Sequence, residues 1–349
     1  MGILVYFYRM NTTAISRRQA IQYTSFFITT MTILSVDALQ AGPLTESSAD
    51  YDVIIVGGSI AGLSAALALG RSLRRVLVID SGKPCNRQTP HSHNFLTRDG
   101  ETPAQLNAIA RAQATAYPSV TILDSRVTTL SKTEGGFAVT TDPSVHYQFR
   151  KVLLATGVED LMPPIDGFAE SWGRSVAHCP YCHGYEVHGQ PLGVLGNGDA
   201  GFEYVQLIQN WSKNLTLFTN GPATLTDEQL RDVRRLDVSI VETPIARIIH
   251  EDGFMRAVQL KDGSHVELTF LLARIPFRQH SDLAQQVGCE LATTGLIIVS
   301  PFGETNVPGL YAAGDNSSLM RSLVMASASG TTAGAWMNRE LIGEDVAAR

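Results

Sequence analysis

The sequence has few cysteines, no excess of positive charge and, after residue 36, no long apolar run. Four cysteines in 349 residues are too few for a secreted scaffold held by disulfides, so the fold must depend on a hydrophobic core. A net charge of −6 leaves no basic surface for a phosphate backbone and argues against a nucleic-acid partner. Without a long apolar run, the body of the chain is not expected to span a membrane. Its length is more typical of two domains than of one.

The N-terminal segment differs in composition from the rest. The only charged residues among the first 36 are three arginines, two of them adjacent at Arg17 and Arg18, and the run 19–36 after them is uncharged. An arginine pair, an apolar run and then small residues suited to cleavage resemble a twin-arginine export signal. We therefore expect residues 1–41 to direct export to the periplasm and to be removed. A membrane anchor, or a true start at Met10 with a cytoplasmic protein, is the alternative interpretation.

A pattern of strand, glycine turn, helix and strand occurs twice. The first copy runs from the apolar stretch Tyr51–Val56 through "GGSIAG" and a helix-forming stretch to a strand that ends at Asp80. The second copy starts at Pro191 with "PLGVLG", followed by "GNGDAG", another helix-forming stretch and "NLTLFT". Continuous apolar strands are typical of parallel sheets covered on both faces, and the whole pattern is that of a nucleotide-binding unit.

The end of the chain indicates how the two copies are connected. The final strand "GLYAAGD" and a helix rich in small residues have no counterpart in the second copy, so we assign them to the first domain. The sequence therefore predicts an α/β fold of two Rossmann-like, doubly wound domains, the second inserted into the first. The expected boundaries are 50–160 and 295–349 for the first domain and 161–294 for the inserted one.

The first glycine turn has the composition of a dinucleotide site. Gly57, Ser59 and Gly62 occupy the three fingerprint positions, with Gly58 beside them and serine in the central place. Pyrophosphate binds at a helix N-terminus, where free N–H groups and the helix dipole favour negative charge and glycines allow a close approach. Asp80, at the end of the next strand, is placed to bind a ribose hydroxyl. The alternative is a tight turn without a ligand.

The second glycine turn fits the fingerprint spacing better, with Gly196, Gly198 and Gly201. The strand after it, however, lacks the charged residue expected at its end. The position equivalent to Asp80 is Thr219. A carboxylate there would favour NAD and an arginine would favour NADP. Neither is present, and the arginines further on are expected on the solvated face of a helix. The sequence leaves open whether nicotinamide nucleotide binding is retained or lost.

The stretch "HCPYCH" places two cysteines, Cys179 and Cys182, between two histidines. A structural zinc site needs four ligands, which usually come as two pairs from separate segments, and no second pair exists here, so we expect no metal. A C-x-x-C motif near two nucleotide units favours a redox-active pair. Pro180 suits the start of a helix, whose N-terminus would lower the pKa of a thiol.

The two histidines of this stretch are candidate acid–base groups. His183 follows the second cysteine and can move a thiol proton, because imidazole titrates near neutral pH. His178 could do the same or line the entrance, and a plain core or cap histidine is the alternative for His183. The other histidines show no readable partner spacing. Cys85 and Cys289 are expected to be buried, inert thiols.

Several motifs in one order, "GGSIAG" with "VLVID", "KVLLATG", "CPYC", "GNGDAG" and "VPGLYAAGD", resemble the thioredoxin reductase branch of the flavin-dependent pyridine nucleotide-disulfide oxidoreductases. The resemblance covers about Tyr51–Leu341. It implies FAD in the first domain, with 57–62 at the pyrophosphate, Asp80 at the ribose and Asp315 at the ribityl chain. The other expected cofactor contacts are Ala61, Ser81, Arg87, Asn94, Val127, Ala155, Thr156, Gly157, Gly314 and Arg321.

The same resemblance implies that Cys182 faces the flavin and that Cys179 exchanges with the substrate. Reductases of this family have an aspartate where this chain has His183, and they carry cations for the NADP phosphate after the strand that here ends at Thr219. Both departures resemble relatives with "CHGYE", which include the dithiol oxidases that form gliotoxin and holomycin. In those, electrons pass from a dithiol to the disulfide, to flavin and to oxygen.

We therefore expect an FAD-dependent thiol-disulfide oxidoreductase that acts on a small dithiol or disulfide or on a thioredoxin-like protein. A dithiol oxidase is one form of it. An NAD(P)H-dependent thioredoxin-disulfide reductase is the first alternative, and a non-catalytic flavin or nucleotide sensor is the second. A homodimer is implied by the resemblance alone.

Overall fold

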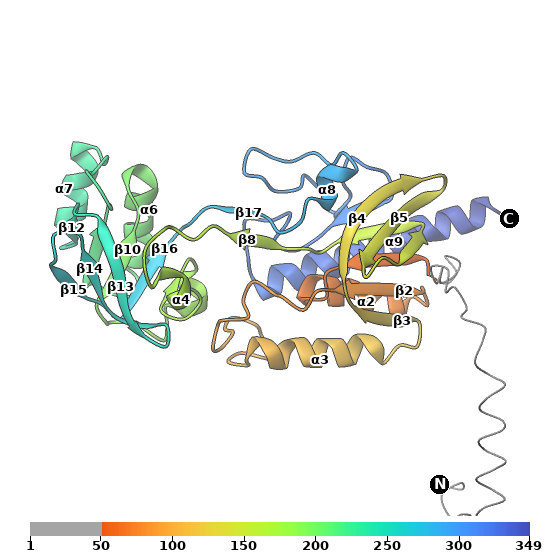
Figure 1. Ribbon diagram of the computed structural model, residues 1–349, viewed down its shortest axis with the longest axis horizontal. Helices are drawn as coiled ribbons and strands as arrows, with labels where there is room; N and C mark the ends of the chain where they lie inside the picture. The colour runs from red at the N-terminus through yellow and green to blue at the C-terminus, as the bar shows by residue number, and fades with distance from the viewer. Residues whose placement is uncertain (1–50) are drawn as a thin grey trace, which may run out of the picture. The chain divides into compact units, whose positions relative to one another are not determined.

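The computed structural model describes residues 51–349, which all fall within one compact unit (Figure 1). The predicted export signal, residues 1–41, lies outside the described residues. Within 51–349, no helix is both long enough and apolar enough to cross a bilayer. Two parallel sheets organise this part of the chain, as the repeated strand–turn–helix pattern predicts.

The first sheet has five parallel strands in the order β18-β7-β1-β2-β3. These strands are β1 (Val53–Val56), β2 (Val76–Asp80), β3 (Val120–Asp124), β7 (Lys151–Leu154) and β18 (Leu310–Ala312). β1 lies in the middle and is buried throughout. Its alternate residues enter different core clusters, Ile54 and Val56 on one face and Val53 and Ile55 on the other. This two-sided burial explains why the strand is a continuous apolar run.

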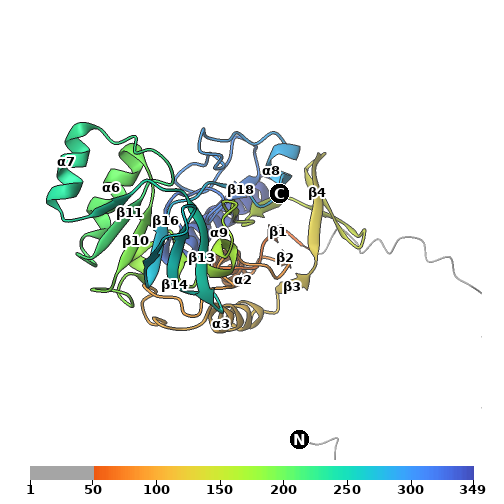
Figure 2. The same cartoon turned by 60° about the vertical axis from the view of Figure 1, so that its left-hand side comes forward.

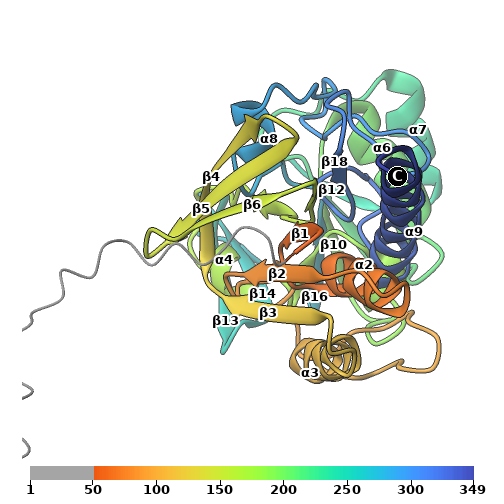
Figure 3. The same cartoon turned by 90° about the vertical axis from the view of Figure 1, so that its right-hand side faces the viewer.

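Helices cover one face of the first sheet, and a small antiparallel sheet covers the other (Figure 3). The helices are α2 (Ile60–Arg71), α3 (Pro103–Thr115) and α9 (Leu323–Ala347). α2 and α9 pack side by side. They approach so closely that a Cβ at Gly330 of α9 would lie only 2.0 Å from the backbone oxygen of Ala61. The small residues of the last helix therefore allow two helices to approach closely.

The antiparallel sheet consists of β4 (Arg126–Thr133), β5 (Gly136–Asp142) and β6 (His146–Phe149). The short helix α8 (Leu283–Gln286) packs against β4. Leu283 and Val287 belong to the core cluster beneath this sheet. Residues within the range 161–294 thus contribute to the core of the first domain.

The second sheet also has five parallel strands, in the order β12-β11-β10-β16-β9 (Figure 2). They are β9 (Val176–Ala177), β10 (Leu192–Leu195), β11 (Leu215–Phe218), β12 (Ser239–Val241) and β16 (Phe270–Ala273). The helices α6 (Gly198–Ile208) and α7 (Asp227–Arg235) cover one face. The other face is covered by α4 (Phe168–Ser171), β13 (Ile245–Glu251), β14 (Phe254–Leu260) and β15 (His265–Glu267).

Two paired strands connect the domains. The chain leaves the first sheet through β8 (Val158–Asp160) and returns through β17 (Phe277–Gln279), and the two pair antiparallel (Figure 1). β18 then joins the first sheet beside β7. The second domain is therefore inserted into the first, as predicted.

Candidate functional site

The first glycine turn has no room for larger side chains at its glycine positions. Gly57 has a φ of +109°, and a Cβ there would lie 2.2 Å from the backbone oxygen of Ala155. A Cβ at Gly62 would lie 1.9 Å from the oxygen of Gly57, and one at Gly58 would lie 2.7 Å from Cβ of Asp80. The strand, the turn and the helix thus approach each other closely, as a dinucleotide turn requires.

The helix after this turn has a free N-terminus. Ser59 is the N-cap residue of α2, and its side chain makes no capping hydrogen bond. The first N–H groups of a twelve-residue helix therefore have no side-chain cap. Such an end favours an anion, and it opens on the cleft described next.

Two connected hollows run from this turn toward the second domain, and together we call them the cleft. The smaller, about 90 Å³, is lined by Asp80 and Val127, and the larger, about 210 Å³, is lined by the Cys179–Cys182 pair. Their shared wall residues are Ser59, Lys83, Pro84, Ala155, Thr156 and His280. A cleft with the carboxylate of Asp80 in one hollow and the cysteine pair in the other fits FAD.

Most of the expected cofactor residues line the cleft. They are Gly57, Gly58, Ser59, Ala61, Asp80, Ser81, Asn94, Val127, Ala155, Thr156, Gly157, Gly314, Asp315 and Arg321. Gly62 does not line it and instead allows α2 to approach the turn. The guanidinium of Arg87 donates to the backbone oxygen of Pro84, 3.2 Å away, within its own loop.

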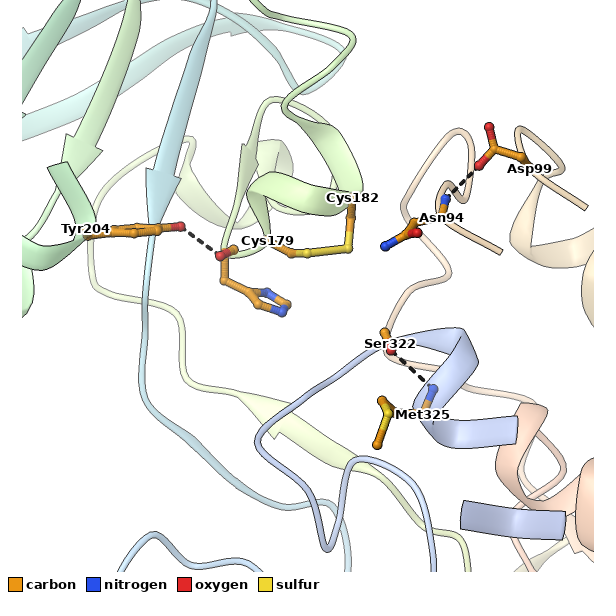
Figure 4. The surroundings of a disulfide bond; sticks show 8 residues. Asn94, Asp99, Cys179, Cys182, Tyr204, Ser322 and Met325 are labelled. Atoms are coloured by element: carbon orange, nitrogen blue, oxygen red, sulfur yellow. Dashed lines mark hydrogen bonds between the residues drawn. A yellow bond between two sulfur atoms is a disulfide. The ribbon is translucent and has the colours of Figure 1, made fainter. Parts of the chain in front are cut away.

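Cys179 and Cys182 form a disulfide at the wall of the cleft (Figure 4). Cys179 is the N-cap residue of the short helix α5 (Pro180–His183), and Pro180 occupies its first position. The Cα atoms of the two cysteines lie 5.4 Å apart, within the usual range for a disulfide. Asn94 and Ser322 of the first domain line the same hollow. The redox pair and the cofactor residues therefore face one space.

Both predicted acid–base histidines also line the cleft, and the pKa of each is lowered from its ordinary value. Burial lowers the pKa of His183, while nearby Glu186 opposes this and His93 adds to it. Burial and the positive charge of Arg321 lower the pKa of His178 to about 4. A neutral imidazole beside a disulfide can accept a proton from an incoming thiol.

The structure makes folding sensitive to acid through His178. Because its pKa is about 4 in the folded protein and near 6.5 when unfolded, the unfolded chain takes up the proton first. The stabilisation from neutral His178 is therefore complete above the pKa of the unfolded chain, and it decreases as the pH falls toward 4. Phenylalanine in His178→Phe keeps an aromatic ring against Trp172 but cannot take up a proton. Between about pH 7 and 4.5, we expect the free energy of unfolding to fall by about 2 to 3 kcal/mol less in this variant than in the wild type. Denaturant unfolding at both pH values measures this, and equal losses would contradict it.

An ion-pair network lines the same hollow as the disulfide. Arg321 binds Asp160 through two nitrogens, at 2.6 and 3.1 Å, and its Nε lies 3.4 Å from Asp315 Oδ2. Trp172 Nε1 also donates to Asp160, at 3.2 Å. A two-point contact fixes the plane of the guanidinium. Arg321 is therefore held in place at the wall of the cleft.

Cys85 lies on the wall of the cleft, and the expectation that it is buried was wrong. It follows β2, and the loop at the carboxyl end of that strand faces the nucleotide site. Desolvation by the surrounding protein and the negative charge of Asp315 raise the pKa of its thiol to about 11. The thiol stays protonated, so its expected inertness agrees with this environment. Cys289 is buried, as predicted.

The second glycine turn differs from the first because the side chain of Asn197 caps the helix that follows it. Gly196 and Gly201 approach closely, since a Cβ at Gly196 would lie 2.9 Å from Gly201 Cα. The side-chain oxygen of Asn197, however, accepts from the N–H groups of Gly198 and Thr224, at 2.9 and 2.8 Å. The N-terminus of α6 is thus capped, in contrast to that of α2.

The strand end beside this turn carries no charged group. The hydroxyl of Thr219 donates to the backbone oxygen of Gly221, 2.6 Å away. The arginines of α7 and its end are exposed, as predicted, and Arg235 pairs with Asp232 of the same helix. The site thus keeps the glycine geometry but has neither a carboxylate for NAD nor a cation for NADP at 219–221.

Sequence reasoning missed two residues near the disulfide. His93 comes from a loop of the first domain, and its Nε2 lies 3.4 Å from Glu186 Oε1 of the second. Glu186 lies three residues after His183, a spacing of one helical turn that could have been noticed. Nothing in the sequence indicated His93. Among residues 51–349, no three His, Cys, Asp or Glu side chains are grouped to hold a metal ion.

Comparison with known proteins places this arrangement in a family. The family described as pyridine nucleotide-disulphide oxidoreductase matches residues 51–330. Thioredoxin reductase tcpT of Claviceps purpurea is 34% identical over 307 residues, which cover 84% of this chain and 95% of that protein. The crystal structure of HlmI is 34% identical with a TM-score of 0.82, and the match covers 88% of this chain and 97% of HlmI.

A third similar protein is a bacterial oxidoreductase of known structure. The crystal structure of the oxidoreductase from Agrobacterium tumefaciens is 35% identical with a TM-score of 0.79, over 84% of this chain and 99% of that one. The disulfide at the cleft and the glycine cradle agree with these similarities. The chain therefore belongs to the pyridine nucleotide-disulphide oxidoreductases, in their thioredoxin reductase-like group, and is an FAD-dependent enzyme that acts on sulfur.

Proposed function

We propose that this thiol-disulfide oxidoreductase works as a dithiol oxidase, which takes electrons from a small dithiol and passes them through FAD to oxygen. The structure of the second glycine turn supports this direction of electron flow, from dithiol to oxygen. Its helix end is capped by Asn197, and no cation stands at 219–221 to hold a nicotinamide phosphate. A reductase needs that nucleotide as its electron source, whereas an oxidase does not.

Residues of the first domain hold the cofactor in this proposal. The free end of α2 and Gly57 suit its pyrophosphate, and Asp80 suits its ribose. Arg321, fixed by Asp160, lines the half of the cleft that contains the disulfide. When bound, FAD supplies an acceptor for two electrons at this wall.

The chain's own residues perform the thiol chemistry. A substrate thiol gives its proton to the neutral imidazole of His183, and the resulting thiolate attacks Cys179 Sγ. The Cys179–Cys182 bond breaks, and Cys182 leaves as a thiolate with the electron pair. The second substrate thiol then attacks the mixed disulfide and releases Cys179 and the oxidised product. The assignment of Cys179 as the exchanging cysteine comes from the family resemblance.

A second candidate function is supported by one observation. Gly196 and Gly201 retain the close contact of a nucleotide turn. An NAD(P)H-dependent reductase of a disulfide or a thioredoxin-like protein would use that turn. Family membership makes the chain an enzyme rather than a non-catalytic sensor.

An anaerobic titration of the purified FAD-loaded protein separates the two functions. We expect dithiothreitol, as a probe dithiol, to bleach the visible flavin band faster than NADPH or NADH by on the order of 100-fold or more, because the nucleotide site lacks its charged partners. Readmitted oxygen should restore the band. Rapid bleaching by NADPH would instead support the reductase.

We also propose that the protein is exported and forms a homodimer. The adjacent Arg17 and Arg18, outside the described residues, support export by a route that accepts folded, cofactor-loaded proteins. Reduced nicotinamide nucleotides are not expected outside the cytoplasm, which agrees with an oxidase. The dimer is supported by the family resemblance alone.

A further inference from the structure

Trp172 belongs to the second domain and reaches a strand that connects the two domains. Its ring lies in the core cluster of the second domain and stacks on Phe168, with the ring centres 5.8 Å apart. Its indole N–H donates to Asp160 Oδ2 at 3.2 Å, and Asp160 is the last residue of β8. Trp172 and the side chain of Asp160 are each only 7% exposed. A buried, charge-assisted hydrogen bond thus ties the second domain to its connection.

Asp160 continues this contact into the first domain. Its two carboxylate oxygens accept from Arg321, at 2.6 and 3.1 Å, and Arg321 directly precedes the N-cap residue of α9. The glycine after Trp172 also touches the first domain, since a Cβ at Gly173 would lie 3.2 Å from Thr89 Oγ1. Trp172, Asp160 and Arg321 therefore form a continuous series of contacts from one domain to the other.

The same tryptophan holds the residue before Cys179. The ring of His178 stacks on Trp172, with the ring centres 5.9 Å apart and the planes 24° apart. The backbone oxygen of His178 accepts from the hydroxyl of Tyr204, on α6, at 2.7 Å (Figure 4). His178 is thus fixed to its own domain through both its ring and its backbone. The position of Trp172 against Asp160 therefore sets the position of the disulfide relative to the first domain.

Electron transfer between the cysteine pair and FAD depends on that position. When the reduced pair closes to the disulfide, two electrons pass to FAD and both thiol protons leave the sulfurs, so one sulfur must lie against the flavin. A misplacement of about 1 Å can slow such a step by about 10²-fold. The ion pair of His93 and Glu186 also joins the domains, at 3.4 Å, but Glu186 is exposed, and exposed ion pairs contribute little.

We propose that Trp172 is a positioning residue, which through Asp160 holds the disulfide against the part of the cleft that binds the flavin. It acts through His178 and Asp160 rather than on the reacting sulfurs. The inference goes beyond the proposed function and holds for either direction of electron flow, because both directions use the same contact between sulfur and flavin.

Anaerobic rapid mixing of the full-length, FAD-loaded protein with dithiothreitol tests this role. Trp172→Phe removes the N–H and keeps a ring against Phe168 and His178. At low dithiothreitol, thiol exchange limits the bleaching of the flavin, and its rate should stay within about twofold of the wild type. At high dithiothreitol, electron transfer limits it, and the limiting rate should fall by about 10- to 100-fold with the flavin content unchanged.

Trp336→Phe is the matched control. The indole N–H of Trp336 donates to Glu304 Oε1 at 2.9 Å, and its ring stacks on Phe302, so this substitution removes a hydrogen bond of the same kind within the first domain. Trp336 is not a lining residue of the cleft. Both rates should stay within about twofold of the wild type.

A spectroscopic measurement tests the position without any substrate. In the Cys179→Ser variant at alkaline pH, the thiolate of Cys182 against oxidised FAD should give a long-wavelength charge-transfer absorption. Adding Trp172→Phe should weaken this absorption by about half or more, because the sulfur moves away from the flavin. Adding Trp336→Phe should leave it unchanged.

The outcomes separate this proposal from the proposed function. If dithiothreitol does not reduce the wild type, the oxidase is rejected, and the charge-transfer absorption alone decides the role of Trp172. Equal limiting rates and equal absorption in Trp172→Phe and Trp336→Phe would overturn the positioning role, as would an absorption missing from Cys179→Ser itself. Should Trp172→Phe lose its flavin or its cooperative unfolding, Asp160→Asn replaces it and weakens the same series at Arg321. A slower limiting rate that appears only together with loss of flavin, in both variants, would also reject the role.

Discussion

Replacing Cys182 by serine is expected to abolish dithiol turnover, with a loss of more than about 10³-fold in kcat. Without the second sulfur the disulfide with Cys179 cannot form, so the protein has no bond that accepts the substrate's electrons. Oxygen uptake with dithiothreitol measures the loss. Cys289→Ala is the control, since this thiol is buried in the core of the first domain, and its kcat should stay within about twofold of the wild type.

The two single-serine variants also distinguish the roles of the cysteines. If Cys179 exchanges with substrate, the Cys182→Ser variant should trap a disulfide probe as a stable mixed disulfide on Cys179, detected by peptide mass spectrometry. The Cys179→Ser variant should trap far less on Cys182. Trapping on Cys182 instead would reverse the assignment, and retained turnover in either variant would contradict the disulfide mechanism altogether.

Gly62→Ala should remove most of the bound FAD and lower the free energy of unfolding by about 3 kcal/mol. The added Cβ would lie 1.9 Å from the backbone oxygen of Gly57 and 3.1 Å from Ile55 Cγ2, so α2 would have to move away from β1. That movement displaces the helix end expected to bind the pyrophosphate. The ratio of flavin to protein absorbance and a denaturant titration measure both effects.

Gly343→Ala provides the matched control. Gly343 lies in the last helix, and a Cβ there would have no heavy atom within 4 Å. Alanine at an exposed helical position should stabilise the protein by about 0.5 to 1 kcal/mol and leave FAD content unchanged. Equal flavin content in the Gly62→Ala variant would show that the close approach of strand and helix is not needed for the cofactor.

Features that depend on neighbours in sequence were predictable. The strand before Gly57, the turn and the helix after it follow from local pattern, and so does the pairing of Cys179 with Cys182. The insertion of one domain into the other was also predictable, because a strand and a helix at the end of the chain had no counterpart in the second copy. Each of these inferences needs only spacing and composition.

Features that depend on contact through space were not predictable. His93 and Glu186 are far apart in sequence and meet only because two domains place their loops together. Cys85 was expected in the core because free cysteines usually are, but its position after β2 puts it at the cleft. The side-chain oxygen of Asn197 that caps α6 also accepts from the backbone N–H of Thr224, which lies 27 residues further along the chain.

The hydrogen bond by which Asn197 caps α6 makes dinucleotide binding at this helix end less favourable. The pyrophosphate of the dinucleotide would compete with the amide oxygen of Asn197 for the same N–H group of Gly198. Giving up that hydrogen bond costs about 1 kcal/mol, which weakens the apparent affinity several-fold before any other contact is counted. Occupancy at ordinary nucleotide concentrations would then depend on contacts that this strand end lacks. In the proposed oxidase, the inserted domain would serve chiefly to carry the disulfide.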